Sequence, residues 1–434
     1  MAEPLSQARL LQFWTPLALT WAIMGVEIPV ISLAVARLPE ATANLAALGA
    51  AIAIAWFSET LITNLTAISL RLARDRESYA VVRRYAVLLI CIASGANCLL
   101  ILSPAFGWML EHGLGLEPDL ARRTTAAYEW LLVWPAAIGV RRFYQGQLIR
   151  HGLTRRVAYG TGVRLVVIAL GALAAAWTGA LPGAEAGAAI LAAAVVAEAV
   201  AAWLMAASAV RTTNATDPVE APPTLVAFWR FYWPLTVMMS LNLGVGALVT
   251  VGLARSQDAI IALAAFPVAH GLNFIARATV TSYQEAVIAL LGEAESHGRA
   301  LRRFALKLGG AATAALALIA VTPAASWLFL GLMDLPERLI EPAREAFLAL
   351  LFYPAVTLWF VWSRARLTHL RHTRPIATAT LLETVLLALA MAAMVGPLDL
   401  PGATAAGLAM TGSRLIANIW LEYAARDRFR ALAR

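Results

Sequence analysis

The sequence predicts an all-α integral membrane protein with about twelve transmembrane helices in two pseudo-symmetric lobes of six helices each. Three observations predict this fold class: the composition, the spacing of the apolar runs and an internal repeat. Of the 434 residues, 61% are hydrophobic and 14% are charged, and the mean hydropathy is +0.72. A soluble globular protein is about half apolar and a quarter charged, so this composition indicates a membrane protein.

The apolar runs are long enough to cross the hydrocarbon core as helices. Each covers about 20 residues, the length that spans about 30 Å of hydrocarbon, and short strands of alternating polarity do not recur. We expect spans centred near Ile23, Trp56, Ala93, Pro135, Val167, Val195, Leu241, Phe274, Ala315, Thr357, Leu389 and Ala409. The N-terminal segment lacks a basic region and a small-residue cleavage site, so we expect the first span to be retained.

Loop charge predicts the orientation. Most of the 34 lysine and arginine residues lie in the two termini and in the loops after even-numbered spans. The positive-inside rule then places both termini in the cytoplasm. The net charge of +8 is accordingly interpreted as topology and contact with anionic membrane lipids, not nucleic-acid binding. Because lysine is nearly absent, as in GC-rich bacterial sequences, we expect a bacterial inner (plasma) membrane location.

No motif for a metal, a cofactor or an internal ATPase is present. Cys91 and Cys98 lie seven residues apart in one span, about 10 Å along a helix, which is too far for a disulfide. No Cys/His spacing suggests zinc, and no glycine-rich phosphate loop occurs. We therefore expect no cofactor and no enzyme activity.

The second half of the chain repeats the first. The run FWTPLALTW at Phe13 matches FYWPLTVMM at Phe231, an offset of 218 residues. At an offset of 219, RRYA at Arg83 matches RRFA at Arg302, and LPGA at Leu181 recurs at Leu400. Each repeat holds six spans, an even number, so both halves enter the membrane in the same orientation.

The repeat predicts three parts: an N-terminal lobe (1–211), a polar, proline-rich cytoplasmic linker (212–225) and a C-terminal lobe (226–434). Two lobes that rock about a midplane cavity are typical of a transporter with alternating access, so the substrate site is expected between them. The alternatives are a duplicated scaffold or a static channel.

Twelve ionisable residues fall inside the predicted spans, where a charge costs several kcal/mol unless it is paired or hydrated. Seven are arginines. Guanidinium groups bind carboxylate and phosphate bidentately, so this surplus favours an anionic cargo. The candidate substrate-binding residues are Arg141, Arg142, Arg164, Arg277 and Arg364, with the polar residues His270, Asn273 and Asn242.

Two acids in the first spans are candidates for ion coupling. Glu27 and Glu59 are expected either to exchange H⁺, or bind Na⁺, as the cavity opens, or to form structural salt bridges. Arg164 aligns with Glu383 at an offset of 219, so both occupy equivalent places in the two lobes. Together with Arg414 they are the candidate gate or interlobe residues.

The two six-span halves, each opening with an aromatic-Pro-Leu run, resemble the multidrug/oligosaccharidyl-lipid/polysaccharide (MOP) exporter superfamily, which includes the multidrug and toxic compound extrusion (MATE) proteins. FYWPLTVMMSLNLGVGALVTVGLAR with FPVAH, and WPAAIGVRRFYQGQLIRHG around Pro135, look most like the progressive ankylosis protein family. This resemblance implies a MATE-like, V-shaped pair of lobes that exports small polyanions such as pyrophosphate, nucleotides and citrate. Glu27 falls where the family has an acid, and Arg277 falls about one turn from its arginine.

The sequence therefore predicts a monomeric secondary active exporter of small organic or phosphate-containing anions. The alternatives within the superfamily are a flippase of lipid-linked sugars, which needs a groove for an acyl or prenyl tail, and a cation or drug antiporter, which needs unpaired acids in the cavity.

Overall fold

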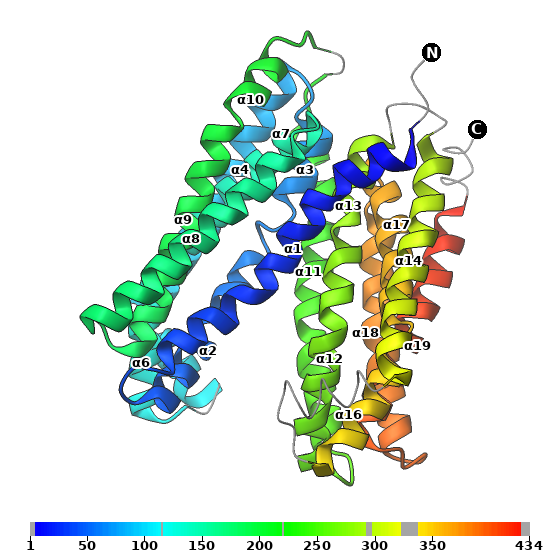
Figure 1. Ribbon diagram of the computed structural model, residues 1–434. Helices are drawn as coiled ribbons and strands as arrows, with labels where there is room; N and C mark the ends of the chain where they lie inside the picture. The colour runs from blue at the N-terminus through cyan, green and yellow to red at the C-terminus, as the bar shows by residue number, and fades with distance from the viewer. Residues whose placement is uncertain (1–4, 114–115, 219–220, 292–296, 323–336, 427–434) are drawn as a thin grey trace. The chain divides into compact units, whose positions relative to one another are not determined.

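The protein is helical throughout the part of the chain that the computed structural model describes, residues 5–113, 116–218, 221–291, 297–322 and 337–426 (Figure 1). Within these residues, eight helical segments are long and apolar enough to cross a membrane. The chain is therefore a multi-pass membrane protein, and the predicted all-α class is confirmed.

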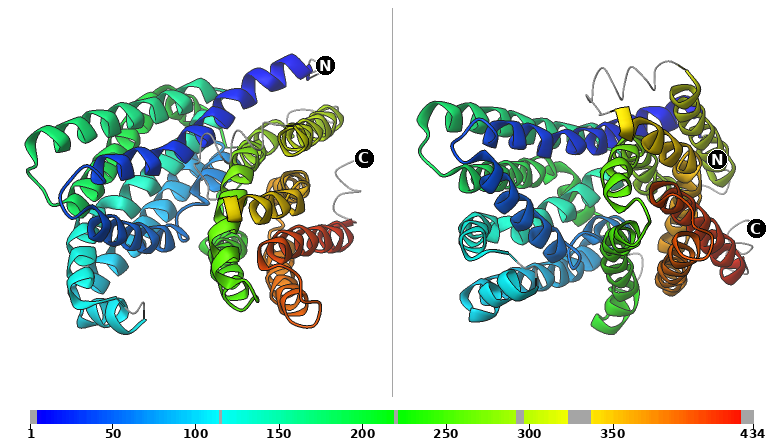
Figure 2. Two further views of the ribbon diagram at one scale, coloured as in Figure 1. Left: turned by 60° about the horizontal axis from the view of Figure 1, so that its bottom comes forward. Right: turned by 90° about the horizontal axis from the view of Figure 1, so that it is seen from below.

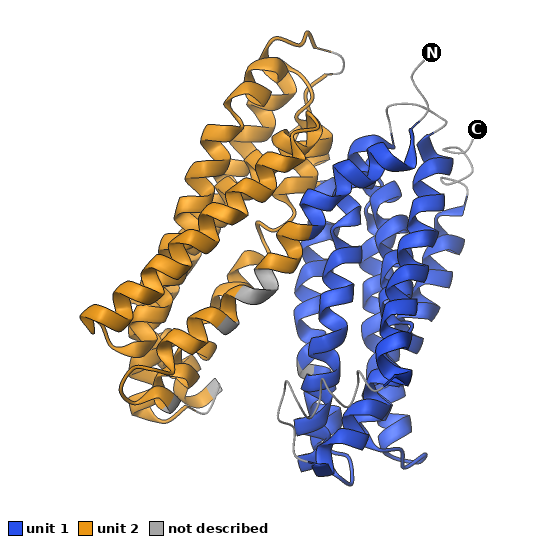
Figure 3. Ribbon diagram, in the orientation of Figure 1, with its two compact units in different colours: residues 1–18, 230–434 blue, residues 19–229 orange. Residues whose placement is uncertain are grey.

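The chain divides into two compact units (Figure 3). Unit 2 comprises residues 19–229, and unit 1 comprises residues 230–434 together with residues 1–18. The long helix α1 (Gln7–Val35) contributes its first residues to unit 1 and the remainder to unit 2. In unit 1, the Gln7 amide donates to the carbonyl of Ala300, and the Trp14 indole donates to the Ser282 hydroxyl at 2.9 Å.

Unit 2 continues from α1 through short and long helices that lie side by side in the views of Figure 2. Its elements are α2 (Ala41–Glu59), α3 (Leu65–Leu72), α4 (Arg76–Leu102), α5 (Pro104–Trp108), a π-helical turn (Met109–Gly113), α6 (Pro118–Trp130), a 3₁₀ turn (Leu131–Val133), α7 (Trp134–Arg150), α8 (Thr154–Thr178), α9 (Gly183–Met205) and α10 (Ala207–Asn214).

Unit 1 contains a set of helices that corresponds to that of unit 2. They are α11 (Leu225–Ala254), most of which lies in this unit, α12 (Ala259–Thr281), α13 (Tyr283–Leu290), α14 (His297–Val321), α16 (Glu337–Ala349), α17 (Tyr353–His369), α18 (Arg374–Val395) and α19 (Gly402–Ala424). The predicted linker (212–225) includes the end of α10 and the start of α11; residues 219–220 lie outside the described residues.

Both units pack their helices in the same pattern. In unit 2, α8 packs on α9, α7 on α9, α3 on α7, α2 on α6 and α4 on α7. In unit 1, α18 packs on α19, α17 on α19, α13 on α17, α12 on α16 and α14 on α17. Each packed pair of helices in unit 2 has a counterpart in unit 1, whose helix labels are higher by ten. The sequence repeat is therefore also a structural repeat.

Local signals fix where these helices begin. Asp75 caps α4 by accepting a hydrogen bond from the backbone N–H of Ser78 at 3.0 Å, and Ser78 returns the bond, which forms a capping box. Proline occupies the first turn of α6, α7, α17 and α18, where its missing N–H has no helical partner to lose. The repeated LPGA motif places Gly183 and Gly402 at the first residues of α9 and α19.

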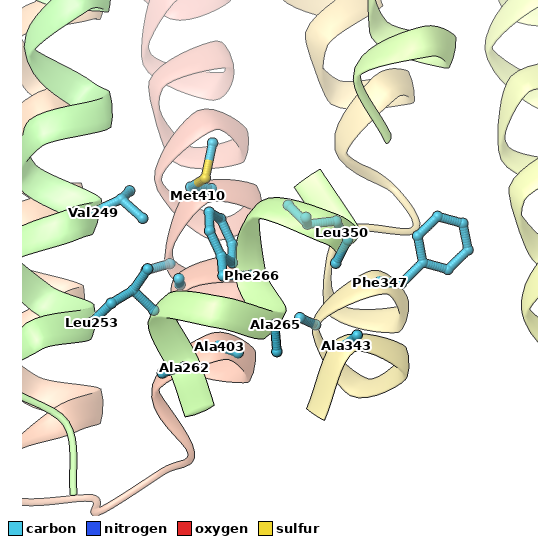
Figure 4. Close-up of a cluster of buried hydrophobic side chains, with 14 of the residues drawn as sticks. Val249, Leu253, Ala262, Ala265, Phe266, Ala343, Phe347, Leu350, Ala403 and Met410 are labelled. Atoms are coloured by element: carbon cyan, nitrogen blue, oxygen red, sulfur yellow. The ribbon is translucent and has the colours of Figure 1, made fainter. Parts of the chain in front are cut away.

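The core of unit 1 contains a cluster of buried apolar side chains from seven of its helices (Figure 4). Leu253 of α11, Phe266 of α12, Phe347 of α16 and Met410 of α19 meet there, with alanines between them. Small residues allow the helix backbones to approach closely, as is common where membrane helices pack. The charged residues of unit 1 described below border this cluster through Tyr353.

Candidate functional site

A buried ion-pair network lies in unit 2 and is centred on Glu198 of α9. The Glu198 side chain is fully buried, and its Oε2 accepts hydrogen bonds from Arg141 of α7 at 3.0 Å and from Arg164 of α8 at 3.2 Å. Its Oε1 accepts from the Thr161 hydroxyl at 3.1 Å and from the Gln145 amide at 3.4 Å. Both carboxylate oxygens are therefore satisfied, as a charge with no contact to solvent requires.

Glu27 of α1 extends this network. Arg164 forms a second ion pair with Glu27 Oε2, and the two side chains are each 3% exposed. Glu27 Oε1 has no hydrogen-bond partner among the described residues, and neither do Nε and Nη2 of Arg141 or Nε of Arg164. The four charges sum to zero, yet among the described residues the network keeps one acceptor and three donors for a further partner.

Two other predicted residues of unit 2 lie near this network. Glu59, at the end of α2, is half-buried and interacts electrostatically with Arg141. Arg142 is buried and lies 6.0 Å from the centre of the Trp21 ring. Arg164 lies in the same way 5.8 Å from the centre of the Trp134 ring, so aromatic faces cover both guanidinium groups.

Unit 1 contains a second buried ion pair. The Arg414 guanidinium of α19 donates from Nε to Glu383 of α18 at 2.6 Å. Arg414 also lies over the rings of Phe360 and Tyr353, at 4.9 and 5.7 Å from their centres. Arg414 is thus surrounded by one carboxylate and two aromatic rings, whereas Glu198 is surrounded by two guanidinium groups.

Arg277 of α12 lies close to this pair. Its guanidinium lies 5.2 Å from the centre of the Phe274 ring and 5.8 Å from that of Tyr353, the ring that Arg414 also contacts. Within the described part of the chain, Arg277 forms no ion pair with a carboxylate. Arg364 of α17, in contrast, interacts electrostatically with Glu285 and with Arg414. Arg277 is therefore a half-buried cation that lies against aromatic faces and that no carboxylate of the described residues pairs with.

Polar residues follow Arg277 back along α12. The Asn273 amide donates to the carbonyl of Leu350 at 2.9 Å, and its buried Oδ1 has no partner among the described residues. His270, one turn further, stacks on the Phe266 ring and interacts electrostatically with Arg277. The three side chains are spaced by three and four residues, so they share one face of the helix. Asn242 is half-buried on α11.

The structure brings the predicted residues together in two groups, one in each unit. Arg141, Arg164 and Glu27 meet in unit 2, whereas Arg277, Arg364, Glu383 and Arg414 gather in unit 1. Arg164 and Glu383 occupy equivalent repeat positions, and each is paired inside its own unit. No group of three or more His, Cys, Asp or Glu side chains suited to a metal occurs among the residues described.

Three contributors were not assigned to the site from sequence. Glu198 is one of the twelve ionisable residues in the predicted spans, and an acid in the alanine-rich run AAAVVAEAV is itself a signal, because a charge inside a span needs a partner or water. Thr161 and Tyr353 gave no signal, because their roles depend on helix rotation.

Comparison with known proteins identifies the fold. No protein-family profile matches the chain, and no curated protein sequence matches it. Solved structures match over nearly the full length. A MOP superfamily transporter from Pyrococcus furiosus, described as having a binding pocket of reverse polarity, is 15% identical with a TM-score of 0.76, covering 98% of this chain and 96% of the other.

Two further structures agree. A MATE transporter of Vibrio cholerae is 16% identical with a TM-score of 0.75, covering 98% of this chain and 97% of its own. An outward-facing multidrug resistance MATE family transporter is also 16% identical, with a TM-score of 0.75 and coverages of 98% and 96%. The chain therefore has the twelve-helix, two-lobe fold of the MATE and MOP transporters.

Proposed function

We propose that the protein is a secondary active exporter that moves small organic or phosphate-containing anions by alternating access. The shared fold supports the transporter class, since the solved structures that match over 98% of the chain are transporters. The repeated helix packing supports it as well, because duplicated halves of this kind allow one rigid body to move against another.

The observation that carries the anion class is Arg277. A cation inside a membrane span costs several kcal/mol unless something compensates it. Two aromatic faces contribute about 0.5–2 kcal/mol each, which is a partial compensation, and no described carboxylate supplies the remainder. A bound carboxylate or phosphate would complete the compensation of the Arg277 charge, and His270 and Asn273 on the same helix face would provide further contacts to this anion.

The geometry narrows the set of arginines in this proposal. Arg141 and Arg164 share Glu198 and Glu27, so their charge is neutralised within unit 2. We assign them a structural role, and we assign anion contact to Arg277 in unit 1, where Arg364 adds a further cation close to Arg414. The predicted surplus of positive charge then resides in one half of the molecule only.

For ion coupling we propose Glu27. Its carboxylate combines deep burial, one ion pair and one oxygen without a described partner, so protonation would break the pair with Arg164 while leaving the Arg164–Glu198 contact in place. A proton gradient could therefore change the packing of α1 against α8 without dissolving the whole network.

The test is uptake of labelled citrate, pyrophosphate and ATP into proteoliposomes, with and without a pH gradient. Arg277→Ala is expected to lower kcat/KM about 10- to 100-fold, the effect of losing a hydrogen bond to a charged group. Arg277→Lys should recover part of the loss. The matched control is Arg122→Ala, since that exposed arginine pairs only with Asp119 on the surface.

Glu27→Gln is expected to remove the response to the pH gradient while exchange of anions across the membrane continues. Thermal unfolding of each variant confirms that it folds. Saturable anion flux that is unchanged in Arg277→Ala would overturn the assignment of the site, and absence of flux for all three anions would overturn the anion class.

A second candidate function is export of organic cations. Glu59 favours it, because this half-buried carboxylate forms no ion pair within the described residues, and one matching structure is a multidrug resistance transporter. Efflux of a cationic dye that is lost in Glu59→Gln and retained in Arg277→Ala would select this function over the first. Transport of a lipid-linked sugar instead of either class would select the flippase alternative.

A further inference from the structure

Two pairs of adjacent arginines occupy equivalent positions in the two halves. Arg83 and Arg84 lie in the second and third turns of α4, and Arg302 and Arg303 lie in the second turn of α14. All four side chains are exposed, and none forms an ion pair within the described residues. Helices α4 and α14 are themselves repeat mates, as their equivalent packing on α7 and α17 shows.

Each pair stands at one end of an exposed apolar stripe. On α4 the stripe continues from Arg84 through Val87, Leu88 and Leu99 to Leu102, which is 81% exposed. On α14 it continues from Arg303 through Leu306 and Leu318 to Val321, which is 74% exposed. In each helix only 22% of the most apolar 18-residue window is buried, so the described residues leave these faces largely uncovered.

The length of the stripes sets the depth of the arginines. Arg84 precedes Leu102 by eighteen residues, and Arg303 precedes Val321 by the same number, which corresponds to about 27 Å of helix. The hydrocarbon core is about 30 Å thick. If each stripe faces acyl chains, the arginine pair at its end lies at the level of the lipid headgroups.

We propose that each arginine pair, with the apolar stripe beside it, is a binding site for one anionic phospholipid. The guanidinium groups would bind the phosphodiester, for which they have bidentate donors, and the acyl chains would lie along the stripe. The capping box of Asp75 and Ser78 fixes the start of α4 and therefore the height of its pair. On α14, Arg299 and Lys307 add exposed positive charge to the same helix.

The charge of the arginine pair and the apolar stripe beside it together favour an anionic phospholipid as the ligand. A zwitterionic lipid brings an ammonium group to a site that already has two cations, whereas phosphatidylglycerol brings none. A soluble anion has no acyl chain, so it would make no contact with the apolar stripe. Since both halves retain the pair beside the stripe, the repeat predicts two lipid sites per molecule.

The test measures the binding of phosphatidylglycerol to purified protein in detergent, with phosphatidylcholine as the zwitterionic comparison. The phosphatidylglycerol concentration at which the rise in Tm is half complete gives the affinity for the lipid. Native mass spectrometry gives the number of lipids bound to each protein molecule. Because each basic residue near an anionic lipid surface contributes about fivefold, R83Q/R84Q and R302Q/R303Q should each weaken one site about 25-fold. Each variant should retain one fewer lipid than the parent, and the fourfold variant two fewer.

The matched control is R37Q/R122Q, which removes the same charge from exposed positions that are not on α4 or α14. Arginine-to-lysine variants of each pair keep the charge and should bind with intermediate affinity. Equal loss in the control, equal stabilisation by phosphatidylcholine, or undiminished lipid counts in the fourfold variant would each overturn the proposal. None of these outcomes depends on the transported cargo.

Discussion

The buried charges of unit 2 and unit 1 lie on equivalent helices with their signs exchanged. In unit 2 the arginine is on α8 and the acid on α9, as Arg164 and Glu198. In unit 1 the acid is on α18 and the arginine on α19, as Glu383 and Arg414. The duplicated fold thus keeps a buried ion pair between equivalent helices, α8 and α9 in unit 2 and α18 and α19 in unit 1, but it does not keep the polarity of that pair.

The net charge around the two ion pairs also differs between the units. Around Glu198, two arginines share the carboxylate and Glu27 balances the second cation. Around Arg414, the rings of Tyr353 and Phe360 take the place of further acids, and Arg277 adds a cation. One half therefore has a neutral charged core and the other a positive one, which is why the anion contact is proposed in unit 1.

The largest expected effect in this comparison is that of Glu198→Gln. It removes the acid that two buried arginines share, and breaking a buried pair costs about 3–5 kcal/mol because an uncompensated charge remains. We expect the free energy of unfolding to fall by that amount, measured by thermal or denaturant unfolding in detergent. Glu129→Gln, at an exposed position of α6, is the control for loss of a carboxylate.

A second substitution identifies the cause. In Glu198→Gln, Arg164 keeps its pair with Glu27, so the uncompensated cation is Arg141. Adding Arg141→Met should therefore recover part of the lost stability. If the double variant is less stable than Glu198→Gln alone, buried Arg141 contributes through contacts other than its charge, and the description of the network is wrong.

A smaller effect is expected from Glu383→Gln in unit 1. The substitution leaves Arg414 without its carboxylate but still between two aromatic rings, so the cost should lie near the lower end of the range, about 3 kcal/mol. The same unfolding measurement checks it. The combination Glu383→Leu with Arg414→Met should return most of the stability, since apolar side chains of similar volume often replace a buried pair. A cost larger than that of Glu198→Gln would reverse the comparison.

The features that the sequence predicts are local or repeated ones. The apolar runs locate the helices because the membrane requires about 20 apolar residues wherever a helix crosses. The LPGA motif predicts equivalent positions in the two repeats, and the structure places its Gly183 and Gly402 at the first residues of the equivalent helices α9 and α19. These signals do not depend on how the helices are rotated.

The pairing of charges could not be predicted, because it depends on rotation and depth. The sequence places Arg141, Arg164 and Glu198 in three different spans, but it does not say that they share one carboxylate. It likewise gives no reason to place Arg277 and Arg414 on the same Tyr353 ring. The gate, ion-coupling and cargo-contact roles of these residues stay predictions.

The smallest expected effect concerns a repeat position where the halves differ by one methyl group. Gly146 of α7 aligns with Ala365 of α17, and a Cβ on Gly146 would lie 2.6 Å from the Thr66 carbonyl oxygen and 2.6 Å from Ser69 Cβ. Helix α3 therefore approaches α7 so closely that Gly146→Ala should cost about 1–3 kcal/mol in unfolding free energy through overpacking. Gly162→Ala in α8 is the matched control, since a Cβ there meets nothing within 4 Å, and it should stabilise the helix by about 0.5–1 kcal/mol. Equal effects of the two substitutions would mean that α3 and α7 separate readily, and the close approach at Gly146 would then not be a tight contact.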